Sequence, residues 1–159
     1  MSTGIQKLQE EYSKIRKSGA LAPIGGTVAP FKKDYLHWVG CFIGPKETPY
    51  EDGLFYFEIK FTNDYPNSKP EVQMRTPIYH PNINNYDGHV CVAYLYNWKS
   101  EYDVRGIVYA LFDLLYMPNP ADGYYKINNE KARDFKNKYA TKDQNIDWNT
   151  SWDKGWNLN

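Results

Sequence analysis

The segment YHPNINNYDGHVCVAYLYNW, residues 79–98, is rich in apolar residues but has no regular period. Pro81, the repeated asparagines and the turn pair Asp87-Gly88 exclude a long helix or a central strand over this segment. The segment also contains His80 and Cys91. A stiff, partly apolar loop that holds reactive side chains is a stronger indication of function than a core segment.

This segment resembles the ubiquitin-conjugating enzymes, in which a His-Pro-Asn tripeptide is followed by a Gly, the catalytic Cys and a Trp. Here these residues are His80-Pro81-Asn82, Gly88, Cys91 and Trp98. Further pieces occur in the family's order and spacing between residues 5 and 140, namely Ile43-Gly44-Pro45, Thr48-Pro49-Tyr50-Glu51-Asp52-Gly53, Tyr65-Pro66 with Pro70, and Pro118-Asn119-Pro120. One tripeptide is a weak signal, whereas the ordered set is specific to the family.

Apolar periodicity predicts helices over residues 3–17, 103–116 and 129–140. The first has an apolar stripe of Ile5, Leu8, Tyr12 and Ile15, with Lys7, Glu10, Glu11, Lys14 and Lys17 on a charged, solvated face. The second has a wider apolar stripe and ends before Pro118, and the third turns Ala132 and Phe135 inward. Trp148, Trp152 and Trp156 are spaced four apart, which predicts a fourth helix within residues 141–159. The alternative is a tail that binds a partner.

The strand signals indicate an antiparallel meander. Phe55, Phe57, Ile59 and Phe61 alternate with Tyr56, Glu58 and Lys60, which predicts a strand with one buried face. Residues 35–43 and 72–74 predict two more strands, whereas the Gly, Pro and Ala residues of 20–34 interrupt the pattern. Together with the resemblance, this predicts a single α+β domain over residues 1–159, with an N-terminal helix, a four-stranded antiparallel meander, a central helix and C-terminal helices.

The resemblance implies acyl transfer, in which Cys91 accepts a modifier's C-terminus as a thioester and a lysine amine then attacks it. It assigns to Asn82 the donation of a hydrogen bond to the oxyanion, although in some members this Asn mainly supports the loop. It implies that His80 braces the loop rather than acting as a base. Cys41 lies within a strand pattern, and we expect it to be a core residue.

A carboxylate near the thioester can orient the incoming lysine and help it to lose a proton. Asp122, just past Pro118-Asn119-Pro120, matches the acidic residue of the family. A simple Asp-Gly turn explains Asp122-Gly123 equally well. Many members have Asp two residues after the catalytic Cys, where this chain has Ala93, and that places more weight on Asp122.

The partners implied by the resemblance are an activating enzyme, the modifier, a ligase and a protein lysine. Lys7 and Lys14 match the basic residues that dock the activating enzyme. Two loops that ligases commonly contact contain Asn67, Trp98 and Lys99. Asn67 stands where one ligase class favours an aromatic residue, and Lys99-Ser100 stands where the family usually has Ser-Pro. The interval from His80 to Cys91 is also one residue longer than in most members. The ligase, and the choice between ubiquitin and a related modifier, therefore stay open.

Bulk properties exclude several other classes of function. Lys plus Arg and Asp plus Glu each number 19, so the chain lacks the basic excess typical of nucleic-acid binding. Cys41 and Cys91 form no Cys-x-x-Cys pair, and we expect no metal and no cofactor, since ATP is consumed by the activating enzyme. The sequence shows no membrane-spanning run and no signal core, which favours the cytoplasm or nucleus.

Two other functions remain open. A non-catalytic variant that binds ubiquitin is one, although such variants usually lack the cysteine. A thiol enzyme that pairs Cys91 with His80 or His89 is the other, but no third orienting group is evident.

Overall fold

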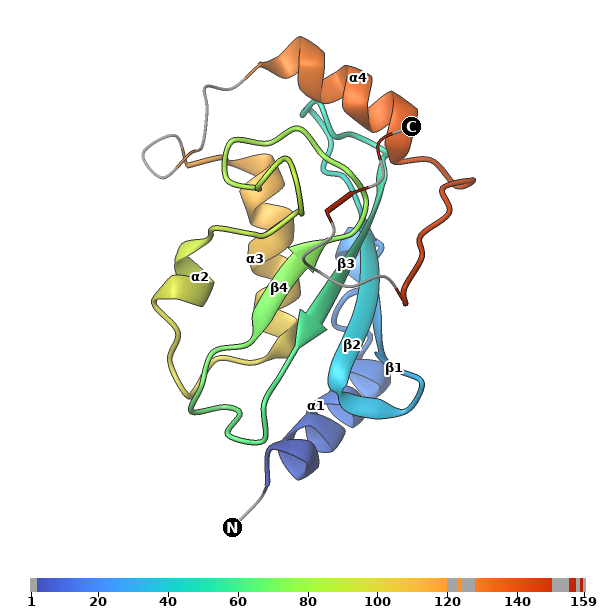
Figure 1. Ribbon diagram of the computed structural model, residues 1–159. Coiled ribbons are helices and arrows are strands. Elements are labelled where there is room, and N and C mark those ends of the chain that lie inside the picture. The colour runs from blue at the N-terminus through green and yellow to red at the C-terminus, as the bar shows by residue number, and fades with distance from the viewer. Residues whose placement is uncertain (1–2, 120–122, 124–127, 150–154, 157, 159) are drawn as a thin grey trace.

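Four antiparallel strands form one sheet in the order β1-β2-β3-β4 in the computed structural model (Figure 1). The strands are β1 (Thr27–Phe31), β2 (Asp34–Ile43), β3 (Leu54–Lys60) and β4 (Glu71–Met74). The structure describes residues 3–119, 123, 128–149, 155–156 and 158. The helices are α1 (Gly4–Ser18), α2 (Ala93–Tyr96), α3 (Val104–Tyr116) and α4 (Asn129–Tyr139), with a short 3₁₀ turn at Ala22–Ile24. The predicted α+β meander is confirmed.

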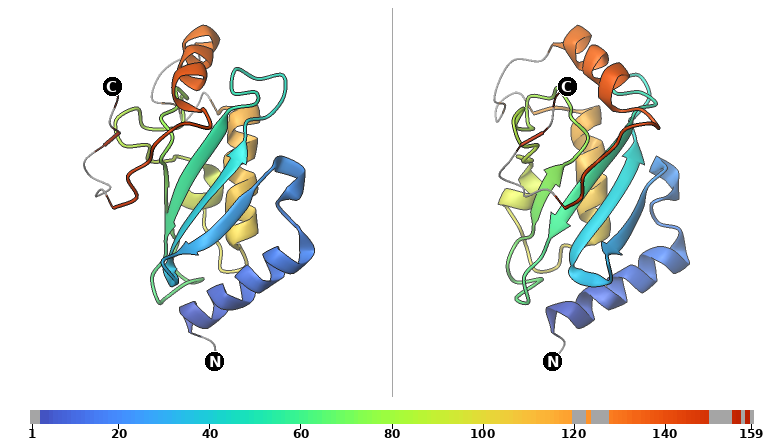
Figure 2. Two further views of the ribbon diagram at one scale, coloured as in Figure 1. Left: turned by 90° about the vertical axis from the view of Figure 1, so that its right-hand side faces the viewer. Right: turned by 45° about the vertical axis from the view of Figure 1, so that its right-hand side comes forward.

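The inner face of the sheet forms the core against α1 and α3, while residues 141–149 lie on the outer face (Figure 2). Phe55, Phe57 and Ile59 of β3 are fully buried, as the alternation predicts. Phe42 of β2 contacts Phe112 of α3, with ring centroids 6.1 Å apart. Burial of such aromatic side chains is the main stabilising contribution to the fold.

Strand β1 lies within the segment that the sequence suggested was irregular. It pairs with β2 from Thr27↔Cys41 to Pro30↔Trp38. Pro30 is tolerated because β1 is an edge strand, where one side of the backbone needs no partner. The sequence did not predict this strand, because glycine and proline are depleted in strands generally. Local composition does not show that a segment lies at the edge of a sheet.

Helix α1 begins at a capping box, in which Thr3 and Gln6 each accept a hydrogen bond from the other's backbone N–H. Two predictions for this helix are wrong. Ile5 is exposed, and Glu11, assigned to the solvated face, is buried. The Glu11 carboxylate accepts hydrogen bonds from the Tyr65 hydroxyl (2.7 Å) and from the Val104 backbone N–H (2.8 Å), so it joins α1 to the start of α3. Burial raises the pKa of Glu11.

Helices α3 and α4 follow the predicted patterns closely. Asp103 caps α3 by accepting a hydrogen bond from the Gly106 N–H at 2.8 Å. The apolar stripe of α3 is buried as predicted, through Val104, Ile107, Val108, Leu111, Leu114 and Leu115. In α4, Ala132 is buried and Phe135 is half-buried against Tyr79. None of the helices within the described residues is long and apolar enough to cross a membrane.

The C-terminal strap, defined here as residues 141–149 and 155–156, contradicts the prediction of a fourth helix. None of its residues is helical, and Trp152 lies outside the described residues. Trp148 packs on Phe31 and Tyr56 of the outer face of the sheet. Trp156 contacts a different surface, near the end of β4. The spacing misled because the two tryptophans bind separate surfaces, not one helix face.

Glu58 of β3 is buried on the face that the alternation assigned to solvent, which corrects the prediction at this position. Glu58 forms ion pairs with His37 and, at 2.6 Å, with Arg75. Arg75 in turn donates a hydrogen bond to the Asp147 carbonyl at 2.8 Å and lies over the Trp148 ring. A buried carboxylate needs such partners.

Candidate active site

Cys91 lies at the end of a loop that is tied to the His80-Pro81-Asn82 turn. Its backbone N–H donates a hydrogen bond to the Asn82 carbonyl at 2.9 Å, directly after a β-bridge between Ile83 and Val90. Helix α2 begins two residues later. Cys91 is half-buried and forms no disulfide. These bonds hold the thiol next to the turn that the sequence singled out.

Two grooves meet at Cys91. The first, of about 540 Å³, is mostly apolar and runs along α3, where Ala110, Asp113, Leu114 and Met117 line it. The second, of about 380 Å³, lies between β4 and α2 and includes Glu71, His89 and Tyr96. Cys91 therefore lines both grooves, an arrangement that suits a group passed between two partners.

His80 is fully buried and is bonded to the backbone through both ring nitrogens. Its Nδ1 accepts a hydrogen bond from the Asn82 N–H (3.0 Å), so its Nε2 carries the proton and donates to the Leu114 carbonyl (2.7 Å). Burial lowers the pKa of His80 to about 4, against a smaller opposite effect of the Leu114 carbonyl. The ring is therefore neutral near pH 7 and joins the turn to the end of α3.

Asn82 is also fully buried, and its amide forms a reciprocal pair of hydrogen bonds with the backbone of Asn119. Nδ2 donates to the Asn119 carbonyl at 2.7 Å, and Oδ1 accepts from the Asn119 N–H at 2.8 Å. An amide nitrogen has two N–H groups, so this pair engages only one of them. Asn82 thus joins the turn to the segment that leads from α3 toward Asp122.

Asp122 lies outside the described residues, so the structure says nothing of its position. Asp113 is an exposed carboxylate of α3 that the sequence analysis missed, and it lines the apolar groove at Cys91. Its only sequence signal is a charge within a mostly apolar helix. The described residues contain no group of three or more His, Cys, Asp or Glu side chains that could hold a metal ion. Cys41 is half-buried in β2, where burial raises its pKa.

Comparisons with known proteins agree with these features. Residues 7–149 match the family model described as ubiquitin-conjugating enzyme. The chain belongs to this family. The Caenorhabditis elegans protein "Ubiquitin-conjugating enzyme E2 1" is 32% identical over 142 residues, which are 89% of this chain and 72% of that protein. A crystal structure of a Plasmodium yoelii protein assigned to the ubiquitin-conjugating enzymes superposes with a TM-score of 0.78 at 28% identity, over 89% of this chain and 97% of the other. The protein is therefore a transferase of the conjugating class.

The residues that match partner-binding positions of ubiquitin-conjugating enzymes fall into two groups. Lys7 is half-buried and Lys14 is exposed, both on α1. The other group is brought together by Trp98, whose indole Nε1 donates a hydrogen bond to the Pro66 carbonyl at 2.7 Å. This bond joins the loop that contains Asn67 to the loop that contains Lys99, and both of these side chains are exposed.

Proposed function

We propose that this enzyme carries ubiquitin as a thioester on Cys91 and transfers it to a lysine amine of a protein, usually with a ligase. The observation that carries the proposal is the position of Cys91 where two grooves meet, beside the His80-Pro81-Asn82 turn. The name of the Caenorhabditis elegans relative favours ubiquitin as the modifier. The activating enzyme supplies the ubiquitin, and ATP is consumed there.

The proposed chemistry consists of two acyl transfers without a change of oxidation state. In loading, the Cys91 sulfur attacks the ubiquitin carbonyl held as a thioester on the activating enzyme, whose own thiol leaves. In discharge, the lysine nitrogen attacks the new thioester, a C–N bond forms, the C–S bond breaks, and the Cys91 thiol is restored. Both steps pass through an oxyanion that needs a hydrogen-bond donor.

Asn82 is the proposed donor to this oxyanion, because its Nδ2 has one N–H that the pairing with Asn119 does not use. His80 is an unsuitable general base, because both ring nitrogens are bonded to the backbone and the neutral ring is fully buried. We assign the orientation of the lysine to a carboxylate, with Asp122 proposed from its sequence position and Asp113 from its place in the groove.

A related modifier on the same thiol is the second candidate. It is favoured by Asn67 and Lys99, which depart from the family pattern on the loops joined by Trp98. The chemistry at Cys91 would be the same, and only the activating enzyme and ligase would differ.

A loading assay tests the proposal. The protein is mixed with an activating enzyme, ATP and ubiquitin, and the products are separated with and without reducing agent. We expect a reductant-sensitive band larger by one ubiquitin, which is retained in Cys41→Ser and replaced in Cys91→Ser by a reductant-resistant oxyester or by no band. An unchanged band in Cys91→Ser would contradict the assignment of the thiol. A band formed only with another modifier and its own activating enzyme would favour the second candidate.

A further inference from the structure

Trp156 of the C-terminal strap contacts the loop that leads to Cys91. Its backbone N–H donates a hydrogen bond to the Tyr86 carbonyl at 2.7 Å. Its indole Nε1 donates to the carbonyl of Met74, the last residue of β4, at 2.8 Å. Trp156 lies beyond residue 149, where the match to the family model ends. A residue outside the matched region thus joins β4 to the loop before Cys91.

The contacted loop, residues 84–89, is here called the flap. It closes on itself through hydrogen bonds from the Asn84 N–H to the His89 carbonyl and from the Gly88 N–H to the Asn84 carbonyl, both at 2.9 Å. The chain continues through the Ile83–Val90 bridge to the bond between the Cys91 N–H and the Asn82 carbonyl. Because these interactions form one continuous ladder, a displacement of the flap changes the position of Cys91 relative to Asn82.

Two glycines allow the strap and the flap to approach closely. Gly88 has φ +81°, and a Cβ there would lie 2.1 Å from the Met74 carbonyl oxygen and 2.8 Å from the Trp156 ring. Gly155 has φ +72°, and a Cβ there would lie 2.8 Å from the Tyr86 carbonyl oxygen. Both the backbone conformation and the spacing favour glycine. The contact therefore depends on specific residues of both segments.

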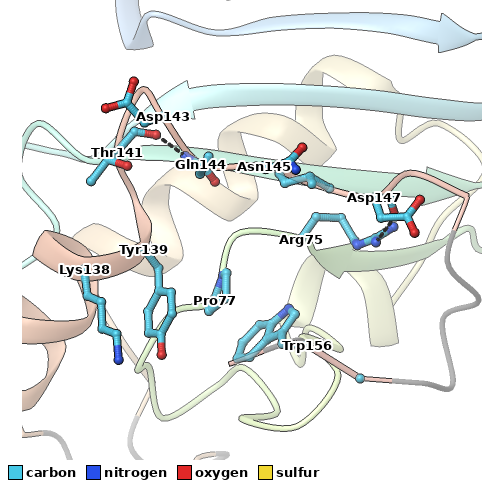
Figure 3. A pocket seen from close by; sticks show the side chains of 12 residues that line it. Arg75, Pro77, Lys138, Tyr139, Thr141, Asp143, Gln144, Asn145, Asp147 and Trp156 are labelled. Carbon is cyan, nitrogen blue, oxygen red and sulfur yellow. Dashed lines mark hydrogen bonds between the residues drawn. The ribbon is translucent and has the colours of Figure 1, made fainter. Parts of the chain in front are cut away.

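Trp156 also lines a hollow of about 530 Å³ (Figure 3). Arg75, Pro77, Tyr139 and Asp147 also line this hollow, and Trp156 is only half-buried. The flap itself adds little apolar burial, since Tyr86 is 62% exposed. The flap is also bound directly to β4, because the Met74 N–H donates to the Gly88 carbonyl at 2.8 Å and the Gln73 side chain donates to the Asp87 carbonyl. Trp156 adds the bond to the Tyr86 carbonyl, on the part of the flap with few buried apolar contacts, where local opening is easy.

We propose that Trp156 is a positioning residue for Cys91, because it holds the flap against β4 and thereby sets the relation of the thiol to Asn82. This inference rests on the proposed thioester function, but its structural part concerns the uncharged enzyme. The other described part of the strap binds a separate surface, where Arg75 donates to the Asp147 carbonyl and Trp148 packs on the sheet. The C-terminal segment thus acts on the active site without touching the reacting atoms.

The test compares Trp156→Phe with Trp148→Phe. The first keeps an aromatic ring but removes the N–H that binds the Met74 carbonyl. The second makes the same change on the same strap, at a ring that packs on Phe31 and Tyr56 of the sheet. Three quantities are measured for each variant: amide hydrogen exchange of residues 84–91 in the uncharged enzyme, the rate of lysine discharge from the charged enzyme, and the melting temperature.

For Trp156→Phe we expect exchange in the flap to become about three- to ten-fold faster, the change that loss of one ordinary hydrogen bond produces. We also expect discharge to slow several-fold at a temperature where the protein is fully folded. Trp148→Phe should leave both rates near those of the unmodified enzyme.

Unchanged exchange in Trp156→Phe would overturn the proposal, and so would faster exchange with unaltered discharge. Equal effects of the two variants would also overturn it, because they would indicate general destabilisation. If the unmodified enzyme accepts no modifier, the proposed function fails separately, and exchange in the two variants still decides whether Trp156 holds the flap.

Discussion

Truncation of Asn82 to alanine separates its two proposed roles, support of the loop and stabilisation of the oxyanion. The variant loses two neutral hydrogen bonds to the Asn119 backbone, of 2.7 and 2.8 Å. Each contributes about 0.5–1.5 kcal/mol net, so the free energy of unfolding falls by about 2 kcal/mol. The small cavity left at a fully buried site adds about 1 kcal/mol.

A loss of about 2–3 kcal/mol lowers the melting temperature of a domain of this size by about 4–12 °C. It leaves a protein of ordinary stability, about 5–15 kcal/mol, folded at 25 °C. A fall in the discharge rate at 25 °C is therefore not a consequence of unfolding. Loss of one oxyanion donor costs about 10²–10³ in rate.

The assay charges Asn82→Ala with ubiquitin, stops the supply, and follows discharge to free lysine at 25 °C beside a thermal melt of the uncharged protein. We expect both the lower melting temperature and the slower discharge. A lower melting temperature with discharge slowed less than three-fold would refute the donor role and leave loop support. An unchanged melting temperature would refute the energetic argument from the Asn119 pairing.

Three further predictions concern the carboxylates near Cys91, the buried Glu11 and the buried His80. Asp122→Ala should slow discharge to lysine while loading stays nearly intact. Asp113→Ala in the same assay decides which of the two carboxylates orients the lysine amine. Equal loss of loading and discharge in either variant would indicate misfolding instead. Because burial raises the pKa of Glu11 in the folded state, its contribution to stability is largest below its unfolded pKa and is lost as pH rises through the folded pKa. Glu11→Gln should therefore gain stability relative to the unmodified protein as pH rises above the ordinary value of 4.5, measured in denaturant titrations. Burial lowers the pKa of His80 to about 4, so the contribution of the neutral ring to stability is present above the unfolded pKa of 6.5 and is lost as pH falls toward 4. The loss amounts to about 3 kcal/mol, and His80→Gln should remove this part of the acid sensitivity of unfolding. An identical pH profile in the variant would contradict the neutral, buried ring.

Local patterns predicted the fold where one rule acted alone. The alternation of β3 and the wide apolar stripe of α3 each reflect burial of an apolar face, and both elements formed where predicted. Prediction failed where a distant segment changed the environment. Glu11 is buried where Tyr65 and the start of α3 supply its hydrogen bonds. Glu58 is buried where His37 and Arg75 pair with it, and Arg75 in turn binds the Asp147 carbonyl of the strap.

The candidate site divides in the same way. The resemblance identified Cys91, Asn82 and His80 from their order along the chain, but it supplied no partner atoms for them. The Asn119 backbone, the Leu114 carbonyl and Asp113 come from sequence positions more than twenty residues away, and only the tertiary structure brings them to the turn.

The sequence by itself determined the family, the sheet with its helices, and the cysteine on which the chemistry is proposed to occur, because ordered motifs and the periodicity of burial are properties of the linear chain. Only the tertiary structure decided the course of the C-terminal strap. Trp148 and Trp156 have the spacing of one helix face, but their rings bind the outer face of the sheet and the end of β4, two surfaces formed by other parts of the chain. Contacts between distant segments outweigh a local preference when they bury more apolar surface and satisfy more hydrogen bonds than a helix turn would.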